Sequence, residues 1–521
     1  MGISSKKRIL ILGAGVMQGP AIRSAQAMGL EAVVLDGDPG APMAGQADRF
    51  EVIDLKDIHK MEEFARKLHA EGGIHGVMTA GTDFSASVAF VAERLGLPGI
   101  PYEAALDASD KERMRGRFSE AGLSSPAFTV FTDARNDVQL PFPFPAVVKP
   151  VDNMGARGCR RVDTEAGLGA AIKDALRFSR SNRAIAEEYM EGPEFSVDAV
   201  VYRGEVTICG LADRHIFFPP YFIEMGHTMP TNFSIKDQEA ILEVFIRGIK
   251  ALGIENGAAK GDIKLTSRGP MIGEIAARLS GGYMSGWTYP YASGVNPVEG
   301  ALSVALGQKP ENLAPQRNWT SAERAFISIP GLVTSVEGLD EAGKTPHVKD
   351  LFLRTGPGQR IYFPENNVSK AGNVITAAQN RETAIQSAEK AAKSILIRLE
   401  APDEATETFM TANSEFPPAA YQLNPVLLIQ LNQIPLTQRH KDTFKVIPFP
   451  AFMESNLVDY AGRCPRETLE AVQKLTGIVL AKAKTGPQET ALGREFWASL
   501  IRGGYQGAVY YIDKLNMPKK K

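Results

Sequence analysis

The stretch Gly257–Gly282 carries two carboxylates, Asp262 and Glu274, on either side of a turn that we expect at Ser267–Pro270. Facing strands of a β-hairpin bring such side chains within reach of each other, and like charges that close repel unless a cation lies between them. Carboxylate oxygens, with no histidine or cysteine in the stretch, suit Mg²⁺, whose other ligands are usually waters and the phosphates of a nucleotide. The pattern therefore predicts a magnesium site at Asp262 and Glu274, with Mn²⁺ as the alternative metal.

A positive charge, Arg278, lies four residues after Glu274 and just before a turn of small residues, Ser280–Gly282. A guanidinium fixed beside a metal–phosphate site can hold a carboxylate or a developing oxyanion through two hydrogen bonds. We therefore interpret Arg278 as a catalytic residue. The stretch also leaves open an ordinary hairpin in which Arg278 and Glu274 form a surface ion pair.

The composition describes a globular protein with more than one hydrophobic core. The chain has 521 residues, of which 44% are hydrophobic and 23% are charged, so about three or four domains are expected. The net charge is −2 and the only basic block is Lys519–Lys521, so nothing indicates nucleic-acid binding. The three cysteines have no metal-ligand spacing, and no apolar run approaches a membrane span. These features predict a cytoplasmic protein without membrane contact.

The first hundred residues alternate between strand and helix patterns. Apolar strands are expected at Arg8–Leu12, Glu31–Asp36 and Gly76–Thr79, with a helix at Pro20–Met28 after the first of them. This alternation predicts an α/β fold with a doubly wound parallel sheet.

The turn after the first strand, Gly13-x-Gly15-x-x-x-Gly19, resembles a dinucleotide-binding fingerprint. Its spacing differs from the G-x-G-x-x-G of that fingerprint, and glycines here also permit a tight turn with close helix–strand packing. A nicotinamide oxidoreductase would depend on this motif alone. The helix N-terminus that follows would also suit a substrate carboxylate.

Lys149 ends a predicted strand shortly before a glycine-bearing loop, Asn153–Gly158. The N–H groups of such a loop can cover a γ-phosphate while the ammonium group supplies a point charge. The segment is not a P-loop, because G-x-x-x-x-G-K-[ST] does not occur. We interpret it as a phosphate clamp, and a hairpin with a solvated turn is the alternative.

An acidic segment, Glu187–Glu194, interrupts a strand, and a further strand is expected at Phe195–Val201. Such a break resembles a hinge between domains, where free backbone groups can pair with the edge of a purine. Glu194 would then accept hydrogen bonds from ribose hydroxyls. The alternative is an acidic turn exposed to solvent.

These segments occur in the order seen in the ATP-grasp superfamily, which the chain resembles over about residues 6–400. Two further segments resemble its L-amino-acid ligase branch. They are Phe222–Pro230, which contains E-x-G-H-x-x-P, and Gly281–Met284 followed by Pro290. His227 in the first of them could hydrogen-bond a substrate near neutral pH, or it could be structural.

The resemblance implies a set of ATP-contacting residues from several segments. They are Lys111 and Lys149 at the phosphates, Gly155, Ala156, Arg157 and Gly158 in the closing loop, Glu187, Glu188 and Met190 at the adenine, and Glu194 at the ribose. Asp262 and Glu274 would bind the metal. Arg278 would act near the reacting group, together with His227. Ala276 stands where the family pattern has asparagine, so whether one or two metals bind is left open.

The same resemblance implies an ATP-grasp architecture in four parts. These are an N-terminal doubly wound parallel sheet at residues 1–108, a small α+β lid at 109–200, an α+β domain with the metal site at 201–400, and an extra segment at 401–521. In the last part we expect helices near Arg466–Lys484 and Glu489–Arg502 and a strand at Gly507–Asp513.

The implied activity is that of an ADP-forming carboxylate–amine ligase, which requires ATP and Mg²⁺. ATP would phosphorylate a small acid, such as an amino acid, and an amine would displace phosphate from the acyl phosphate. The partners would be these small molecules, in a homodimer that binds neither nucleic acid nor membrane. Two alternatives stay open within the superfamily: a carboxylase or carbamoyl-phosphate-type enzyme that phosphorylates bicarbonate, and a catalytically idle ATP-binding protein.

Overall fold

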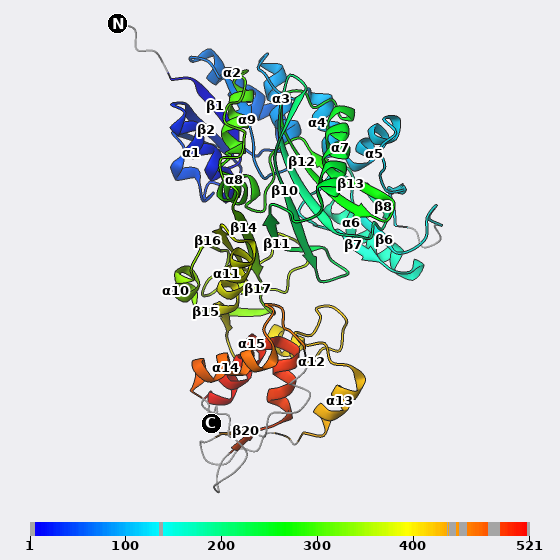
Figure 1. Ribbon diagram of the computed structural model, residues 1–521, viewed down its shortest axis with the longest axis vertical. Helices are drawn as coiled ribbons and strands as arrows, with labels where there is room; N and C mark the ends of the chain where they lie inside the picture. The colour runs from blue at the N-terminus through cyan, green and yellow to red at the C-terminus, as the bar shows by residue number, and fades with distance from the viewer. Residues whose placement is uncertain are drawn as a thin grey trace. The chain divides into compact units, whose positions relative to one another are not determined.

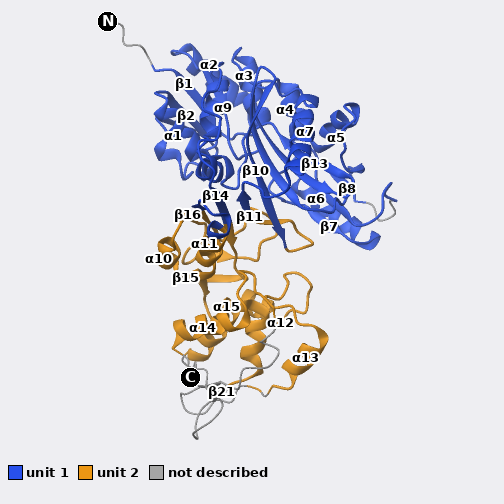
Figure 2. Cartoon of the chain, viewed as in Figure 1, with its two compact units in different colours: residues 1–217, 226–323, 377–384 blue, residues 218–225, 324–376, 385–521 orange. Residues whose placement is uncertain are grey.

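The computed structural model describes residues 6–134, 139–434, 436, 444–446, 456–477 and 490–517. The chain divides into two compact units, shown in Figure 2. Unit 1 comprises residues 1–217, 226–323 and 377–384, and unit 2 comprises residues 218–225, 324–376 and 385–521. Among the described residues, no helix has the length and apolar character needed to cross a membrane.

The N-terminal part of unit 1, coloured blue in Figure 1, contains a parallel sheet. Its strand order is β3-β2-β1-β4, which confirms the prediction of a parallel sheet. Its elements are β1 (Arg8–Leu12), α1 (Gly19–Ala27), β2 (Glu31–Asp36), β3 (Arg49–Val52), α2 (Ile58–Ala70), β4 (Gly76–Met78), α3 (Ser85–Arg94) and α4 (Tyr102–Ser109). Along β1, Ile9 and Ile11 enter one buried cluster, and Leu10 and Leu12 enter another. Because both faces are covered, all four residues of Ile9–Leu12 are apolar.

The glycine turn after β1 is held by its own neighbours. Gly13 has a φ of 101°, a value that favours glycine. The N–H of Ala14 donates to the Asp36 carboxylate at 2.7 Å, and the N–H of Gly15 donates to the Gln18 side chain at 2.9 Å. The glycines and the acidic residue therefore act as parts of a tight turn, and the geometry gives no support to a nicotinamide site here.

A four-stranded antiparallel sheet follows, in the order β5-β8-β6-β7. The elements of this part are α5 (Lys111–Glu120), β5 (Phe128–Phe131), β6 (Ala146–Pro150), β7 (Arg160–Val162), α6 (Leu168–Phe178) and β8 (Ala184–Glu188). One face packs on α6 through a cluster that includes Val148, Ile172 and Ala186. Because side chains alternate along a strand, Lys149 and Glu187 lie on the opposite face.

The largest sheet has eight strands in the order β13-β12-β9-β10-β11-β14-β18-β16. Its strands are β9 (Glu194–Tyr202), β10 (Glu205–Phe217), β11 (Ile223–Met229), β12 (Gly257–Thr266), β13 (Gly269–Ala276), β14 (Thr320–Phe326), β16 (Val348–Leu353) and β18 (Gly372–Ala378). On β9, Phe195, Val197 and Ala199 share a core cluster with Phe245 of α7 (Ile235–Ala251). The alternate residues of β9 therefore lie on the other face of the sheet.

Three further helices lie between or after the strands of this sheet along the chain. They are α8 (Tyr289–Ser293), α9 (Pro297–Ala305) and α11 (Arg381–Ser394).

Strand β9 continues across residue 200, where a domain boundary was predicted. The division into four domains stays a prediction.

Unit 2 contains a three-stranded antiparallel sheet in the order β17-β15-β19 and the C-terminal helices. Its further elements are β15 (Gly331–Glu337), α10 (Leu339–Lys344), β17 (Arg360–Ile361), β19 (Leu396–Leu399), α12 (Glu404–Thr411), α13 (Pro425–Asn432), β20 (Phe444–Val446), α14 (Pro465–Thr476), β21 (Thr490–Leu492) and α15 (Arg494–Asn516). Tyr421, Leu469 and Trp497 are buried in one cluster. The described residues of the extra C-terminal segment are therefore folded and mainly helical.

The strand predicted at Gly507–Asp513 is wrong, because these residues lie inside α15. Ala508, Val509 and Ile512 are buried along that helix, at the three- and four-residue spacing of an α-helical face. A short apolar run is compatible with a strand and with a buried helix when periodicity is the only guide.

The two helices predicted in this part correspond to α14 and α15. Helix α14 covers the first half of Arg466–Lys484, and residues 478–489 lie outside the described residues. The helix predicted at Glu489–Arg502 begins at Arg494. Shortly after the predicted end, α15 has a kink at Gly504, whose φ of 59° and ψ of −139° are not helical, and it continues beyond the kink to Asn516.

Candidate active site

The face of the large sheet opposite the α7 core carries charged side chains from four strands. We call it the polar face, and its members are Glu194 and Asp198 on β9, Arg214 on β10, Lys260, Asp262 and Lys264 on β12, and Glu274 on β13. Residues that are opposite each other in register, or two apart along a strand, share a face of the sheet. The strand register therefore gathers charges of both signs beside one another.

Asp262 and Glu274 are opposite each other on β12 and β13, which confirms the predicted hairpin. Asp262 lies 2.9 Å from Arg214 and also pairs with Lys260, and the Glu274 carboxylate lies 3.6 Å from the Lys111 ammonium. The described residues contain no group of three or more His, Cys, Asp or Glu side chains suited to a metal. Two carboxylates fit a Mg²⁺ ion that takes its other ligands from water and phosphate, so this donor set fits the predicted metal.

Glu274 is held in its charged form by its surroundings. Burial by itself would raise the pKa of its carboxyl, but the positive charges of Lys111 and Lys260 outweigh burial and bring the pKa to about 2. A carboxyl with this pKa is deprotonated at neutral pH, as a metal ligand must be. The electrostatics therefore agree with the role predicted for Glu274.

Lys149 is anchored by a buried carboxylate. Its Nζ lies 2.7 Å from one oxygen of Glu187, whose other oxygen lies 2.9 Å from Arg115. Arg115 also donates to the backbone oxygens of Ile272 and Gly273. Burial would raise the pKa of Glu187, but Arg115 and Lys149 lower it by more. The Glu187 side chain therefore positions Lys149. Because both of its carboxylate oxygens are paired with Lys149 and Arg115, the geometry does not support the predicted contact of Glu187 with adenine.

The connection from β8 to β9 is fixed by contacts from the β12–β13 hairpin. Lys264 donates to the backbone oxygen of Met190 at 3.1 Å and lies 3.6 Å from the Glu194 carboxylate. Glu188 lies 2.7 Å from Arg268 in the hairpin turn. The segment connects two different sheets, which agrees with its interpretation as a hinge. The nucleotide contacts of Glu188, Met190 and Glu194 stay predictions.

Lys111 begins α5 and reaches the loop that we predict to close over phosphates. Its side chain is 6% exposed, and its Nζ donates to the backbone oxygen of Asn153 at 2.8 Å. Within the loop, Gly155, Ala156 and Gly158 have φ values of 69°, 59° and 68°. These left-handed residues keep the loop out of regular secondary structure, so its N–H groups are not committed to a strand or helix ladder.

Hydrogen exchange across Asn153–Gly158 is expected to slow when ATP and Mg²⁺ are added. The loop is polar and rich in glycine, so it has little apolar surface to bury and opens at low cost without a nucleotide. Mass spectrometry of exchange with and without ATP and Mg²⁺ tests this, with the α2 segment as a reference that should not change. Equal exchange in both states would remove the loop from nucleotide binding.

Arg278 lies just after β13, next to the closing loop. It is 7% exposed, its Nη1 donates to the backbone oxygen of Leu279 at 2.9 Å, and its Nη2 lies 3.8 Å from the Met154 sulfur. Within the described ranges, Arg278 and Glu274 form no ion pair, and the arginine is buried. The alternative of a surface ion pair between them therefore has no support.

Sequence reasoning missed Asp83, which the fold places among the same cations. Asp83 follows β4 and lies 3.2 Å from Arg180. Burial raises its pKa, and the charges of Arg180, Arg278 and Lys111 partly offset that effect. Its position after a parallel strand is a signal that could have found it, because ligands of doubly wound sheets bind beyond the carboxyl ends of the strands.

Asp198 holds the small-residue turn that follows Arg278. Its carboxylate accepts hydrogen bonds from the Ser280 hydroxyl at 2.7 Å and from the Ser280 N–H at 3.3 Å. The residue is fully buried, and burial raises its pKa to about 6 although the Ser280 donors and the charge of Lys260 lower it. Asp198 therefore positions the turn beside Arg278.

Asp198→Asn is expected to change how stability depends on pH. The folded pKa of about 6 exceeds the ordinary value of 3.8, so the folded protein binds this proton more tightly than the unfolded chain does. The resulting stabilisation is complete below about pH 4 and is lost as the pH rises through about 6. Relative to the variant, the wild type should lose on the order of 1 kcal/mol of unfolding free energy between about pH 5 and pH 7.5. Urea unfolding across this range measures the difference, and parallel curves would contradict it.

His227 is buried on β11 and pairs with a carboxylate on β14. Its Nδ1 lies 2.9 Å from Glu323, and both residues are at most 1% exposed. A buried, oriented imidazole of this kind serves a structural role as well as a catalytic one. The catalytic role of His227 stays a prediction.

Three family models match the chain over separate ranges. An ATP-grasp N-terminal domain matches residues 22–99, an ATP-grasp domain matches residues 142–286, and the L-amino acid ligase C-terminal domain 2 matches residues 325–400. The central match contains Lys149 and both predicted metal ligands, and all three occur in the order that the sequence resemblance implies.

Curated relatives are similar to the chain at low identity. The uncharacterized protein y4rH of Sinorhizobium fredii is 24% identical over 383 residues, which cover 72% of this chain and 79% of that protein. Carnosine synthase 1 of Gallus gallus is 26% identical over 385 residues, which cover 67% of this chain and 41% of the synthase. D-alanine–D-alanine ligase of Pseudomonas entomophila is 29% identical over 198 residues, covering 36% and 58% of the two chains. The chain thus spans less than half of the carnosine synthase.

Solved structures share the fold. L-amino acid ligase from Bacillus licheniformis matches with a TM-score of 0.67 at 22% identity, covering 76% of this chain and 99% of the ligase. Biotin carboxylase from Campylobacter jejuni matches with a TM-score of 0.58 at 20% identity, covering 75% and 91%. At such identities a structural likeness shows the fold alone. The three family models, which match in order along the chain, identify the family as well. The chain belongs to the ATP-grasp superfamily and carries the C-terminal domain of its L-amino acid ligases.

Proposed function

We propose that the chain is an ATP- and Mg²⁺-dependent carboxylate–amine ligase that forms ADP and acts through an acyl phosphate. The observation that carries this proposal is the buried guanidinium of Arg278, which lies between the carboxylate hairpin and the closing loop. A fixed guanidinium beside a metal–phosphate site suits a substrate carboxylate and the oxyanion that forms on it. The match of residues 325–400 to the L-amino acid ligase domain supports the same reading.

In this proposal, side chains of the polar face and the lid neutralise charge during phosphoryl transfer. Asp262 and Glu274 would hold Mg²⁺, which supplies positive charge to the phosphate oxygens. Lys149 and Lys111 would bind phosphate groups as point charges. The loop Asn153–Gly158 would exclude water, which would otherwise hydrolyse the acyl phosphate.

The proposed reaction has two steps. A carboxylate oxygen of the acid attacks the γ-phosphorus, the bond from phosphorus to the bridging oxygen breaks, and ADP leaves. The amine nitrogen then attacks the acyl carbon and loses a proton. Phosphate leaves together with the oxygen that came from the carboxylate of the acid. Arg278 would hold the carboxylate in the first step and the oxyanion in the second. Because the acyl phosphate is itself the activated intermediate, the proposed reaction needs no covalent nucleophile from the protein.

We infer that the acid is a small molecule such as an amino acid. This inference is supported by what similar proteins are called, namely carnosine synthase, D-alanine–D-alanine ligase and L-amino acid ligase. The partners in catalysis would then be a small carboxylate and a small amine. A homodimer stays a prediction.

A carboxylase or carbamoyl-phosphate-type enzyme is the alternative within the superfamily, because biotin carboxylase shares the fold. In such an enzyme bicarbonate would be the phosphorylated acid. A catalytically idle ATP-binding protein is the third possibility, and Ala276 at the place of a family asparagine is the feature in its favour.

Release of phosphate from ATP and Mg²⁺, measured against a matrix of amino acids, other small acids and amines, tests the proposed function. We expect turnover that depends on an acid and an amine together and that yields ADP rather than AMP. Turnover that depends on bicarbonate alone would favour the carboxylase alternative. Tight ATP binding without turnover in any mixture would favour the binding protein, and either outcome would overturn the ligase.

A further inference from the structure

Arg157 in the closing loop is half-buried and forms no ion pair with any described residue. Its Nε donates to the backbone oxygen of Met154 at 3.0 Å, and within the described residues its Nη1 and Nη2 have no hydrogen-bond partner. Neither nitrogen is among the enclosed polar atoms of the structure that lack a partner, so both keep accessible surface. A ligand can therefore reach this unpaired charge.

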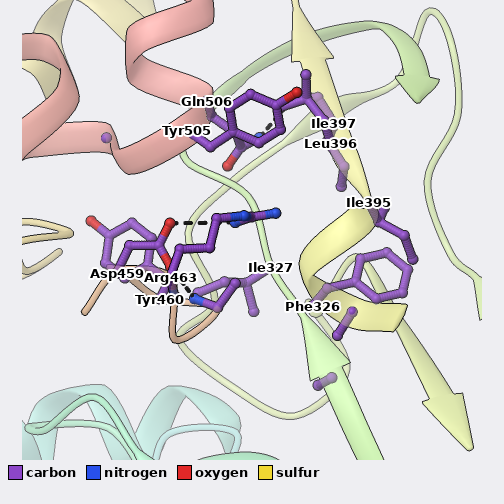
Figure 3. Close-up of a pocket in the computed structure, with 14 residues that line it drawn as sticks. Phe326, Ile327, Ile395, Leu396, Ile397, Asp459, Tyr460, Arg463, Tyr505 and Gln506 are labelled. Atoms are coloured by element: carbon purple, nitrogen blue, oxygen red, sulfur yellow. Dashed lines mark hydrogen bonds and ion pairs between the residues drawn. The ribbon is translucent and has the colours of Figure 1, made fainter. Parts of the chain in front are cut away.

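An arginine in unit 2 shows the arrangement that Arg157 lacks. Arg463 lies in the wall of a cavity of about 40 Å³, which is drawn in Figure 3. Its Nη1 lies 3.3 Å from the Asp459 carboxylate, and its Nη2 donates to the backbone oxygen of Lys393. The protein itself therefore neutralises this guanidinium, and the cavity has room for only a few water molecules. We assign it a structural role.

The surroundings of Arg157 contain a carboxylate that is already paired with another guanidinium. That carboxylate, Asp83, lies 3.2 Å from Arg180. Burial lowers the pKa of Arg157, the negative charge of Asp83 raises it, and the positive charge of Arg180 lowers it. Because Asp83 forms its ion pair with Arg180, the charge of Arg157 stays without a partner of its own in the described ranges.

A second guanidinium without an ion pair among the described residues, that of Arg278, contacts the same loop residue. The Nη2 of Arg278 lies 3.8 Å from the Met154 sulfur, while Arg157 donates to the Met154 backbone oxygen. Like charges held near each other repel unless opposite charge lies close to them. The two guanidiniums therefore favour a ligand with two negatively charged groups.

The backbone brings the segment of Asp83 to the same place. The N–H of Gly81 donates to the backbone oxygen of Leu279, the residue after Arg278, at 3.2 Å. Asp83 follows β4, beyond the carboxyl end of a parallel strand, where ligands of doubly wound sheets bind. Burial raises the pKa of Asp83, and the charge of Arg278 is among those that lower it. The unpaired guanidiniums therefore lie at the edge of the parallel sheet where a substrate is expected.

The nucleotide has other cations available to it. In the function proposed above, Lys111 and Lys149 supply positive charge to the phosphates of ATP together with the metal. Arg157 instead shares Met154 with Arg278, which we assign to the acid. The acid is therefore the better-placed source of an anion for Arg157.

We propose that Arg157 binds a second negatively charged group of the acid substrate, whose reacting carboxylate lies at Arg278. This inference rests on the proposed function and names its substrate class, a small acid with two anionic groups. It gives Arg157 a ligand other than the ATP that the family resemblance implies. An anionic oxygen at Arg157 forms charge-assisted hydrogen bonds with the two free nitrogens and neutralises a half-buried charge.

The experiment measures acyl-phosphate formation with hydroxylamine as the amine, so that the natural amine need not be known. The hydroxylamine nitrogen attacks the acyl carbon, phosphate leaves, and a hydroxamate forms that can be measured. The full chain receives ATP, Mg²⁺, hydroxylamine and one acid at a time. Each dianionic acid is paired with a relative of similar shape that lacks one charge. The pairs are succinate with succinamate, glutarate with glutaramate, aspartate with asparagine, glutamate with glutamine, and O-phosphoserine with serine.

Three variants accompany the wild type. Arg157→Gln removes the charge, and Arg157→Lys keeps the charge but loses the two-pronged geometry. Arg177→Gln is the matched control, because the Arg177 side chain at the end of α6 is 75% exposed. The KM for ATP is measured for each variant, and circular dichroism melting checks that each is folded.

We expect the wild type to prefer at least one dianionic acid over its singly charged relative by at least about tenfold in kcat/KM. Arg157→Gln should lower kcat/KM for that acid by about 10- to 100-fold. It should leave the singly charged relative within about threefold and the KM for ATP nearly unchanged. Arg157→Lys should recover part of the preference, and Arg177→Gln should behave as the wild type does.

The proposal is overturned if the wild type uses the singly charged acids as well as the dianionic ones. It is also overturned if folded Arg157→Gln keeps the wild-type preference, or if that variant loses ATP affinity instead of the preference. If the wild type forms no hydroxamate with any of the acids, the ligase function itself fails and this inference fails with it. Hydroxamate formation by the wild type therefore separates the two failures.

Discussion

Lys149→Ala is expected to weaken ATP binding, or to lower turnover, by about 10- to 100-fold. The Lys149 side chain is 14% exposed, and its ammonium group is held 2.7 Å from Glu187. A charge held in this way is already oriented toward its ligand, and its contacts with phosphate are charge-assisted hydrogen bonds, which are stronger than neutral ones. Alanine removes this charge and leaves Glu187 paired with Arg115.

Two further variants separate the lost charge from general damage. Lys149→Gln keeps a hydrogen-bond donor near Glu187 and removes only the charge, and Lys250→Ala removes an exposed lysine at the end of α7. Calorimetry with ATP and with NAD, together with melting temperatures, should show lost ATP affinity in both Lys149 variants and unchanged affinity in Lys250→Ala. Unchanged ATP affinity throughout, or binding of NAD with ATP ignored, would contradict an ATP site at Lys149.

Arg278→Ala is expected to lower turnover by about 10²- to 10³-fold with every acid, while ATP and Mg²⁺ bind almost normally. A guanidinium stays charged at any working pH and can hold two oxygens at once. Arg278 is buried beside Met154 of the closing loop, so it is preorganised for oxygens that carry charge during the reaction. Its loss should affect the reaction much more than nucleotide binding.

Matched variants test that difference. Arg278→Lys keeps the charge but loses the two-pronged geometry, so its turnover should fall between those of the wild type and the alanine variant. Arg247→Ala removes an exposed arginine of α7 and should leave turnover unchanged. If Arg278 is structural, the alanine variant should instead lose melting temperature or metal affinity. Normal turnover in Arg278→Ala would leave the residue without a catalytic role.

The predictable part of the site is the part that local rules determine. The short turn between Thr266 and Gly269 and the alternation of side chains predict the hairpin, but counted from that turn they would place Asp262 opposite Gly273. A β-bulge between Asp262 and Ile263, which the sequence analysis did not predict, shifts the register by one residue and places Asp262 opposite Glu274. The parallel sheet was also predictable, because its buried strands are continuous apolar runs such as Ile9–Leu12.

The contacts that sequence reasoning missed join residues far apart in the chain. Arg115 reaches the backbone of Gly273, and Asp198 holds Ser280. Neither pairing has a local signal, because each depends on how α5, β9 and β13 pack in three dimensions. Glu187 was expected at the adenine, but its acidic segment does not reveal that the buried Arg115 lies beside it.

Transfer of oxygen-18 from the acid to phosphate tests the central claim most directly. The reaction would contain ATP, Mg²⁺, an amine and an acid that support turnover, with the acid labelled in its carboxylate. If a carboxylate oxygen attacks the γ-phosphorus and phosphate then leaves the acyl carbon, each released phosphate carries one oxygen from the acid. Mass spectrometry of the phosphate should therefore show one label per molecule formed. Unlabelled phosphate at the same extent of turnover would contradict an acyl phosphate and the ligase mechanism built on it.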